Sequence, residues 1–248
     1  MEPPLNHFSD EPEKYRSSRP FFPEALIQEV MSMAKGHALA LDAGTGNGQL
    51  AGRLVPGFDK VIGLDISLEQ ISVAFERNRV EYRQGRAEDT GLPEESVDLI
   101  TCAQSFHWFD RDAFYKEVLR ILKPNGLLAL LGYGLIQGDD RFNAMMDDFY
   151  HQQIYDYWPE RRRWIEAAYQ NFSFPFDEVQ LTDDYQIEVN WDKASLMNYL
   201  SSWSAVKCFQ KANSFDPVRA YWEGYQMKGS RRFTFPVFYR IGYRPIRP

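Results

Sequence analysis

A glycine-rich segment from Leu41 to Gln49, with the sequence LDAGTGNGQ, is the part of the chain whose residue types point most directly to chemistry. It follows an apolar run and precedes an amphipathic one, so it lies where a predicted strand passes into a predicted helix. Glycines at such a turn let the backbone bend sharply and approach a ligand closely. Open α/β sheets bind ligands at the carboxyl ends of their strands. The segment therefore predicts a ligand-binding turn.

The spacing of the glycines restricts the kind of ligand. A dinucleotide-binding turn needs its third glycine three places after the second, but Gln49 stands there and Gly48 comes one place too early. Asp42, two residues before the first glycine, would repel a pyrophosphate and is compatible with a ligand that carries an ammonium and a sulfonium. The Gly-Lys-Ser/Thr of a phosphate-binding loop is absent. These features disfavour a nicotinamide-dependent oxidoreductase.

A second acidic residue, Asp65, ends the next predicted strand. It follows the glycines by about twenty residues, where an acid binds ribose hydroxyls in doubly wound folds. A carboxylate can accept hydrogen bonds from both hydroxyls of a ribose diol. An isolated aspartate would more often cap the following helix, but together with the glycine turn Asp65 predicts a ribose contact.

Residues that could act on a second substrate follow the fourth predicted strand and recur in the second half of the chain. His107 has the titration range of a general base, although it could instead position substrate or bond the loop backbone. Trp108 is a candidate pocket wall or a packed anchor. Tyr199 and Trp203, four residues apart, are expected on one face of one helix, in the core or against an acceptor. Residues 161–163, all arginine, form a solvated face or a carboxylate clamp.

These residues require a scaffold, and the hydrophobic pattern predicts one of alternating strands and helices. A first helix is expected between Pro23 and Gly36. Five apolar stretches then predict strands, at 38–44, 60–67, 80–85, 96–105 and 127–134. Amphipathic stretches predict helices between them, at 47–55, 68–78 and 112–122. Near-continuous apolar strands separated by helices are typical of a parallel sheet buried on both faces.

The pattern changes after Gly134. Residues 139–172 have helical character, 179–191 are expected to form two short strands, and 231–244 the last strand. Two further helices are expected to begin after Asp192, as an N-cap, and at Asp216-Pro217. The fold class is therefore α/β, with a doubly wound sheet in the first half and closing strands and inserted helices in the second.

Composition and charge bear on partners and location. The formal charge of −7 argues against general polyanion binding. Seven basic residues and one acid from Pro217 onward form a solvated tail or a patch for an acidic substrate or phosphate backbone. Cys102 and Cys208 fit no disulfide framework or metal spacing, and Cys102 is expected as a small buried hydrophobe. With no apolar signal core and no membrane-length apolar run, we expect a cytoplasmic protein without metal or membrane partner, a nuclear address being the alternative.

Taken in order, the motifs resemble those of the class I S-adenosylmethionine-dependent methyltransferases. DAGTGNG is similar to the first motif and Asp65 to the acid of the second. GRAEDTGLPEESVDLITCAQSFHWFD resembles the third and fourth motifs, and RILKPNGLLAL the segment that leads into the fifth strand. A narrower resemblance, to the trans-aconitate methyltransferase-like or methyltransferase type 11 group, rests on FSDEPEKYRSSRPFFP, QSFHWFD and YLSSWSAV. Thr45 departs from that group, which often has cysteine there.

The resemblance implies a doubly wound, mostly parallel, seven-stranded sheet of the Rossmann-like type, with inserted helices over the active site. Residues 1–36 would form an N-terminal lid and first helix, and 37–136 the cofactor-binding core. Residues 137–248 would supply cap helices and the closing strands of the same sheet.

The resemblance also implies S-adenosyl-L-methionine as the cofactor. Asp42 would lie near its ammonium, Asp65 would bind its ribose and Ile66 would pack on its adenine. The residues expected to bind the cofactor all follow or end predicted strands: Asp42, Ala43, Gly44, Gly46, Asp65, Ile66, Ala87, Glu88 and Gln104.

The expected activity is methyl transfer to a small-molecule acceptor, with a carboxylic acid as one candidate. A carboxylate is already a nucleophile, whereas a hydroxyl or amine usually needs its proton removed. The catalytic candidates are His107 and Tyr15, and the substrate candidates are Arg19, Trp108, Tyr199 and Trp203. The alternatives are a methyltransferase that acts on nucleic acid or protein, and a non-catalytic S-adenosylmethionine-binding module. The acidic net charge and the lack of an Asn/Asp-Pro-Pro-Tyr type motif after the fourth strand disfavour nucleic acid.

Overall fold

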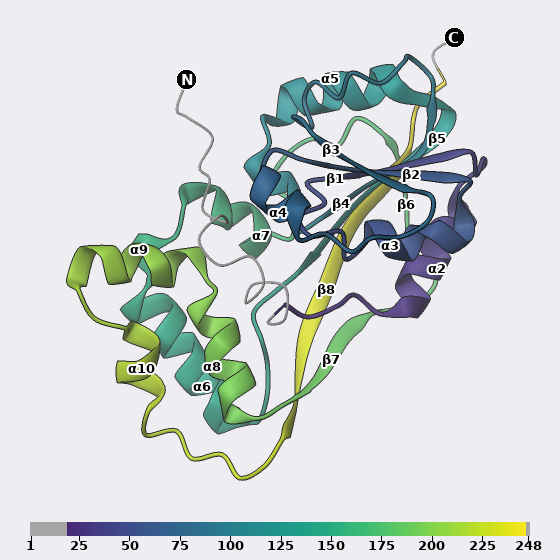
Figure 1. Ribbon diagram of the computed structural model, residues 1–248. Coiled ribbons are helices and arrows are strands. Elements are labelled where there is room, and N and C mark those ends of the chain that lie inside the picture. The colour runs from purple at the N-terminus through teal and green to yellow at the C-terminus, as the bar shows by residue number, and fades with distance from the viewer. Residues whose placement is uncertain (1–18, 247–248) are drawn as a thin grey trace.

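One twisted sheet organises the molecule (Figure 1), a computed structural model that describes residues 19–246. The strand order is β3-β2-β1-β4-β5-β8-β6, with β7 paired to β8 outside this path. The first five strands are parallel to one another: β1 (Leu39–Ala43), β2 (Lys60–Asp65), β3 (Val80–Gln84), β4 (Val97–Ala103) and β5 (Leu122–Tyr133). The closing strands are antiparallel: β6 (Asp177–Val179), β7 (Gln186–Trp191) and β8 (Arg231–Tyr243). The doubly wound, mostly parallel α/β sheet is confirmed.

The expected number of seven strands was too low by one, because β8 is long enough to pair with β7 in addition to β5 and β6. Residues 237–243 of β8 pair with β5 inside the main sheet. Residues 231–236 continue beyond its edge and pair with β7. Figure 1 shows β8, in yellow, running from the sheet towards the helices of the second half, with β7 beside it. The extension ties the helical part of the chain to the sheet.

Side chains on the strands alternate between the two faces, as strand geometry requires. On β5, Leu127, Ala129 and Leu131 join the core under α2 (Glu24–Met33) and α3 (Ala51–Leu54). Leu128 and Leu130 join the core under α5 (Arg111–Ile121) on the opposite face. Cys102 is fully buried in this second core, so its prediction as a small hydrophobe is confirmed. The sheet is therefore buried on both faces.

Two predicted helices are shorter than expected. The stretch 47–55 becomes helical only at α3, because Gly48 still has the left-handed φ of 78° that the glycine turn requires. The stretch 68–78 gives only α4 (Leu68–Ser72). Beyond it the Phe75 amide donates to Asn47 O, and Phe75 O accepts from the Tyr82 hydroxyl. These contacts replace the hydrogen bonds that a longer helix would make.

The second half adds a group of helices at one end of the sheet, where Figure 1 shows α6, α8, α9 and α10 gathered together. The helices of the second half are α6 (Asp140–Asp148), α7 (Arg163–Glu166), α8 (Lys193–Ser201), α9 (Ser204–Asn213) and α10 (Pro217–Trp222). A π-helical turn, η3 (Phe149–Gln153), and two 3₁₀ turns, η4 (Tyr155–Tyr157) and η5 (Glu160–Arg162), lie between α6 and α7. Asp192 caps α8 as predicted, and α10 begins at Pro217 as predicted, with Asp216 as its N-cap. No helix within residues 19–246 is both long and apolar enough to cross a bilayer.

The helical group shares its core with the sheet. Phe142, Phe149 and Leu196 belong to the same buried cluster as Leu26 of α2 and Leu131 of β5. Burial of apolar surface stabilises this arrangement by roughly 25 cal/mol per Å². The helices are therefore held against the end of the sheet at which the carboxyl ends of β4 and β5 lie.

Candidate active site

The glycine-rich turn is held tightly on two sides. Gly44, Gly46 and Gly48 have φ values of 68°, 55° and 78°, which glycine adopts without the strain of a Cβ atom. A Cβ on Gly44 would overlap the Ser105 side chain, and one on Gly48 would overlap the Tyr82 hydroxyl. Above Gly46 the space is open, since a Cβ there would meet only an amide oxygen at 3.9 Å. The turn is thus packed from below and accessible at Gly46.

Asp65 joins the end of β2 to this turn. Its carboxylate accepts a hydrogen bond from the Gly46 amide at 2.7 Å and from the Ser67 amide at 2.9 Å. Burial raises the pKa of Asp65 above its usual value. Ser67, and not Asp65, caps α4 through its hydroxyl. Ile66 exposes 44% of its surface beside this carboxylate, which is unusual for an isoleucine and suits an adenine-packing role.

Asp42 lies beneath the turn. Its carboxylate accepts from the Thr45 hydroxyl at 2.6 Å and from the Thr101 hydroxyl at 2.8 Å. Burial raises the pKa of Asp42 to about 6. The Ser105 hydroxyl donates to Ala43 O at 2.7 Å and closes the same region from β4. These contacts make Asp42 a support for the turn, and its contact with the cofactor ammonium stays a prediction.

The remaining cofactor candidates are Ala87 and Glu88, which follow β3, and Gln104, which follows β4. Ala87 is buried, and the Glu88 carboxylate accepts from the Asp110 amide at 2.8 Å at the start of α5. Their contact with adenine stays a prediction. Gln104, at the end of β4, has a left-handed φ of 54°, and its side-chain amide donates to Tyr133 O at 2.9 Å. Such backbone strain in a non-glycine residue is often found at functional sites.

A pocket of about 600 Å³, including open solvent, brings six predicted residues together. They come from the first described residue, the end of β4, η2 (Phe106–Trp108) and the α8–α9 region. They are Arg19, Gln104, His107, Trp108, Tyr199 and Trp203. The other catalytic candidate, Tyr15, lies outside the described residues. Prediction from sequence missed Tyr133 at the end of β5, and it missed Trp158 and Pro159, whose only signal was the aromatic richness of residues 139–172.

The charge of this pocket is positive. Arg19 and Arg162 line it, and its lining within residues 19–246 contains no aspartate or glutamate. Arg162 donates to the Tyr150 hydroxyl at 3.2 Å, and no carboxylate within the described chain forms an ion pair with it. Arg19 donates to Ser202 O at 3.3 Å and lies 5.6 Å from the centre of the Tyr199 ring. Guanidinium groups in this setting are suited to bind a carboxylate.

The arginine run splits into three roles. Arg161 donates to the carbonyls of Trp108 and Phe109 at 2.9 and 3.1 Å, and so fixes the turn that carries His107. Arg162 enters the pocket, and Arg163 is exposed. The predicted clamp is therefore reduced to Arg162.

His107 is buried, and its Nδ1 lies 3.3 Å from the Tyr169 hydroxyl. Burial lowers the pKa of His107 well below its usual value, and the charges of Arg162, Arg161 and Arg19 lower it further. The imidazole is therefore neutral at physiological pH. Tyr169 has a left-handed φ of 59°, and Arg240 donates to its carbonyl at 3.2 Å. No sequence pattern pointed to Tyr169, because it lies 62 residues from its partner.

The prediction that one helix carries both Tyr199 and Trp203 is wrong. The helix α8 ends at Ser201, and Trp203 has the extended backbone of an N-cap before α9. The carbonyl of Ser202, at this break, accepts from Arg19. The two rings still meet edge to face, with 5.5 Å between their centres. Both therefore reach the pocket from separate helices.

The basic C-terminal stretch is largely neutralised by acids elsewhere in the fold. Four of its arginines form ion pairs, Arg231 with Asp139, Arg232 with Glu188, Arg240 with Glu178 and Arg244 with Glu95. Arg247 lies outside the described residues. Of the predicted phosphate-binding patch, only Arg219 and Lys228 among the described residues form no ion pair. The four ion pairs act as structural links.

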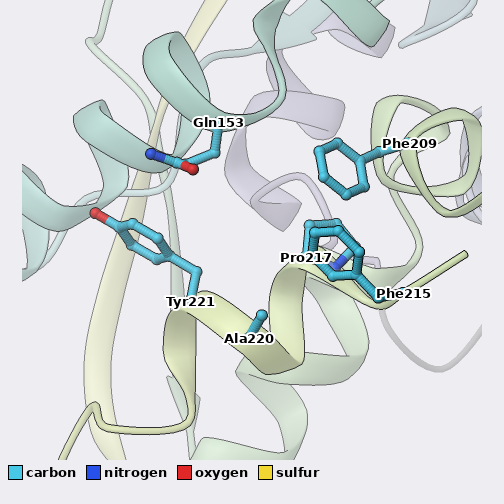
Figure 2. Close-up of a pocket in the computed structure, with 6 residues that line it drawn as sticks. All are labelled: Gln153, Phe209, Phe215, Pro217, Ala220 and Tyr221. Carbon is cyan, nitrogen blue, oxygen red and sulfur yellow. The ribbon is translucent and has the colours of Figure 1, made fainter. Parts of the chain in front are cut away.

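Figure 2 shows a second pocket, formed by residues that follow α6 and by α9 and α10. Its lining is mostly apolar, with Phe209, Phe215 and Pro217 around it. The Tyr221 hydroxyl at its edge already donates to Asp148 at 2.6 Å. The described residues that line this pocket include no charged group, and its Tyr221 hydroxyl is already bonded to Asp148. The pocket that contains His107 is therefore the candidate active site.

Comparison with known proteins identifies the family. Residues 41–130 match the family model described as a methyltransferase domain. A relative from Dictyostelium discoideum, whose name assigns it to the methyltransferases and states no acceptor, is 35% identical over 206 residues, which are 82% of this chain and 78% of the relative. A methyltransferase-like protein from Schizosaccharomyces pombe is 33% identical over 131 residues, about half of each chain at 51%.

A solved structure gives the same result over almost the whole length. It comes from Anaeromyxobacter dehalogenans and is described as a type II methyltransferase. It is 35% identical, covers 91% of this chain and 98% of its own, and superposes with a TM-score of 0.81. The narrower resemblance to the trans-aconitate group stays a prediction. The chain belongs to the class I S-adenosylmethionine-dependent methyltransferases, and S-adenosylmethionine is its cofactor.

Proposed function

We propose that the protein transfers a methyl group to the carboxylate of a small molecule bound in the pocket that Arg19 and Arg162 line. The observation that carries the proposal is the charge of this pocket, with two guanidinium groups and no acid among its described lining residues. A carboxylate would gain charge-assisted hydrogen bonds there. A cationic acceptor would be repelled.

The cofactor side of the site fits S-adenosylmethionine. The open face at Gly46, the Asp65 carboxylate and the exposed Ile66 would hold the methionine part, the ribose and the adenine in that order. When bound, the cofactor supplies an electrophilic methyl group on a sulfonium. Gln104 lines the acceptor pocket from the end of β4, so it would lie where the cofactor and the acceptor meet.

His107 acts in this proposal as a hydrogen-bond donor. The Tyr169 hydroxyl has no other partner in the described part of the chain, and a buried hydroxyl is costly when it donates to nothing. It therefore donates to Nδ1 of the neutral imidazole, which leaves the proton on Nε2. An Nε2–H group at the pocket would orient a carboxylate. A carboxylate needs no proton removed before it attacks, so a base is not required.

The test is a methyl-transfer assay with matched acceptors. Acetate, succinate and tricarballylate would each be compared with the corresponding amide, at fixed S-adenosylmethionine. We expect S-adenosylhomocysteine and a base-labile methyl ester from at least one acid and from none of the amides. Transfer to an amide or to an alcohol analogue at a similar rate would contradict the carboxylate proposal. Cofactor binding without transfer to any of the acids would do the same.

Methylation of nucleic acid receives no comparable support, because most of the C-terminal arginines are ion-paired. Both cysteines, Cys102 and Cys208, are free thiols, which supports a reducing, cytoplasmic setting as part of the proposal.

A further inference from the structure

Trp158 carries a buried indole N–H that has no hydrogen-bond acceptor among the described residues. The indole nitrogen is a donor only, and buried donors in folded proteins are rarely left unpaired. The residue follows η4 and lines the same pocket as His107 and Arg162. An unused donor beside an active-site pocket indicates that its acceptor is supplied from outside the chain.

The surroundings of Trp158 hold its ring in one orientation. The guanidinium carbon of Arg162 lies 4.5 Å from the ring centre. The rings of Tyr150 and Trp203 each lie 5.5 Å away, centre to centre. Arg162 is itself held by its hydrogen bond to the Tyr150 hydroxyl. The indole and the guanidinium are therefore fixed relative to each other before an acceptor arrives, which lowers the entropy that binding must overcome.

The position of Trp158 distinguishes it from Tyr115 and Trp222, which also carry buried donor atoms. Tyr115 Oη and Trp222 Nε1 also lack partners within residues 19–246. Neither residue lines the active-site pocket, and both are packed among other aromatic rings in the core. Trp158 combines the unpaired donor with a pocket and a neighbouring cation.

We propose that the Trp158 indole N–H donates a hydrogen bond to an oxygen of the same anionic group of the acceptor that Arg162 binds, which makes Trp158 a specificity-determining residue. This inference rests on the proposed function, because it assumes that the acceptor is bound as an anion. Arg162 supplies charge and Trp158 supplies direction, so the pair selects acceptors with a planar carboxylate over those with a neutral amide or a single hydroxyl.

The test observes the indole N–H directly by NMR. The full chain, with ¹⁵N-labelled tryptophan and saturated with S-adenosylhomocysteine, would be titrated with succinate, tricarballylate and succinamide. We expect a downfield shift of the Trp158 indole proton with at least one acid and none with succinamide. Trp158→Phe should weaken binding of that acid by at least about tenfold, the lower end of what a hydrogen bond to a charged group contributes.

Trp164→Phe is the matched control. Trp164 also has an arginine over its ring, with Arg161 at 5.9 Å, but it does not line the pocket. Its replacement should leave acid binding unchanged. If Trp158→Phe fails to fold, the shift in the unmodified chain, assigned by triple-resonance NMR, still decides the question.

The two proposals fail in different ways. Binding of an acid that depends on Arg162, with an unmoved Trp158 resonance and unchanged affinity in Trp158→Phe, would overturn the Trp158 inference alone. If none of the acids binds while the cofactor product does, both proposals are wrong.

Discussion

The cofactor half and the acceptor half of the site are built in different ways. Around the glycine turn most contacts use backbone atoms, as where the Gly44 and Thr45 amides donate to Leu64 O and the Gly46 amide donates to Asp65. The acceptor pocket is made of side chains from distant segments, from Arg19 to Ser204. Its charge and its donors depend on single residues.

This difference explains how one fold can keep its cofactor and change its acceptor. A site fixed by backbone conformation tolerates few substitutions, because each must keep the same φ and the same close contacts. A pocket made of side chains on separate helices changes with each substitution while the sheet is unaffected. Variants that affect one half and not the other therefore test whether the two are independent.

The largest effect is expected from Gly44→Ala. The residue has a φ of 68°, and the added Cβ would overlap Ser105 and approach Phe109 to 3.1 Å. Backbone strain alone costs about 1–3 kcal/mol, and the overlap would displace the end of β4. We expect cofactor affinity, measured by isothermal titration, to fall more than about a hundredfold, with a lower melting temperature.

Gly91→Ala is the control that separates the backbone strain of a positive φ from the close contacts at the glycine turn. Gly91 has a φ of 66°, but a Cβ there meets nothing within 4 Å. We expect a small loss of stability and unchanged cofactor affinity. Unchanged affinity in Gly44→Ala would show that the turn is not fixed by its backbone, and the two halves would then not differ in this respect.

The difference between the cofactor half and the acceptor half also decided what could be predicted from the sequence. The strands and the glycine turn were accessible because their signals lie within short windows, such as the apolar stretch that became β4 and the 42–48 motif. The lengths of the helices that follow β1 and β2 were overestimated. The first starts late because Gly48 still has the left-handed φ of the glycine turn, and the second ends early because the Phe75 amide donates to Asn47 O. Tyr169 was missed because its partner His107, 62 residues away, is brought to it only by tertiary packing. Trp158 was missed although Arg162 is four residues away, because nothing in that aromatic-rich stretch marked it as part of the pocket.

Arg162→Ala should show the complementary effect. Loss of the guanidinium removes a charge-assisted contact with the acceptor, worth about 2 kcal/mol. We expect the acceptor KM to rise about thirtyfold, with cofactor affinity unchanged. Arg163→Ala is the control, because the Arg163 side chain, next to Arg162 in the sequence, is exposed and does not line the pocket. Equal effects of the two variants would remove the specific role of Arg162, and a fall in cofactor affinity would show that the halves are coupled.

Asp42→Asn tests the support beneath the glycine turn through its pH dependence. Burial raises the pKa of Asp42 from 3.8 to about 6, so the folded chain holds this proton more strongly than the unfolded chain. Its contribution to stability therefore falls as pH rises from about 4 to about 6. The neutral asparagine should raise the free energy of unfolding by about 1–2 kcal/mol at pH 7.5.

This advantage should shrink towards pH 4, where Asp42 is protonated in the folded chain. Urea unfolding of both proteins between pH 4.5 and 8 would measure it. If Asp42 also contacts the cofactor ammonium, the more stable variant will bind S-adenosylmethionine more weakly. A difference that does not change with pH would contradict the buried ionisable carboxyl.

Tyr169→Phe should give the smallest effect, since it removes only one oxygen behind the acceptor pocket. Without the hydroxyl donor, His107 loses the partner that keeps its proton on Nε2. We expect acceptor KM to rise about fivefold, as for a lost hydrogen bond of about 1 kcal/mol. The ¹⁵N shifts of the imidazole should move from those of a single tautomer to those of a mixture, which a purely structural role would not produce.

Tyr115→Phe is the matched control, because the buried Tyr115 hydroxyl has no partner in the described chain. Its loss should change neither the acceptor KM nor the tautomer. An unaltered imidazole spectrum in Tyr169→Phe would mean that His107 is oriented by the turn that Arg161 holds, so the backbone would fix the acceptor half as it does the cofactor half.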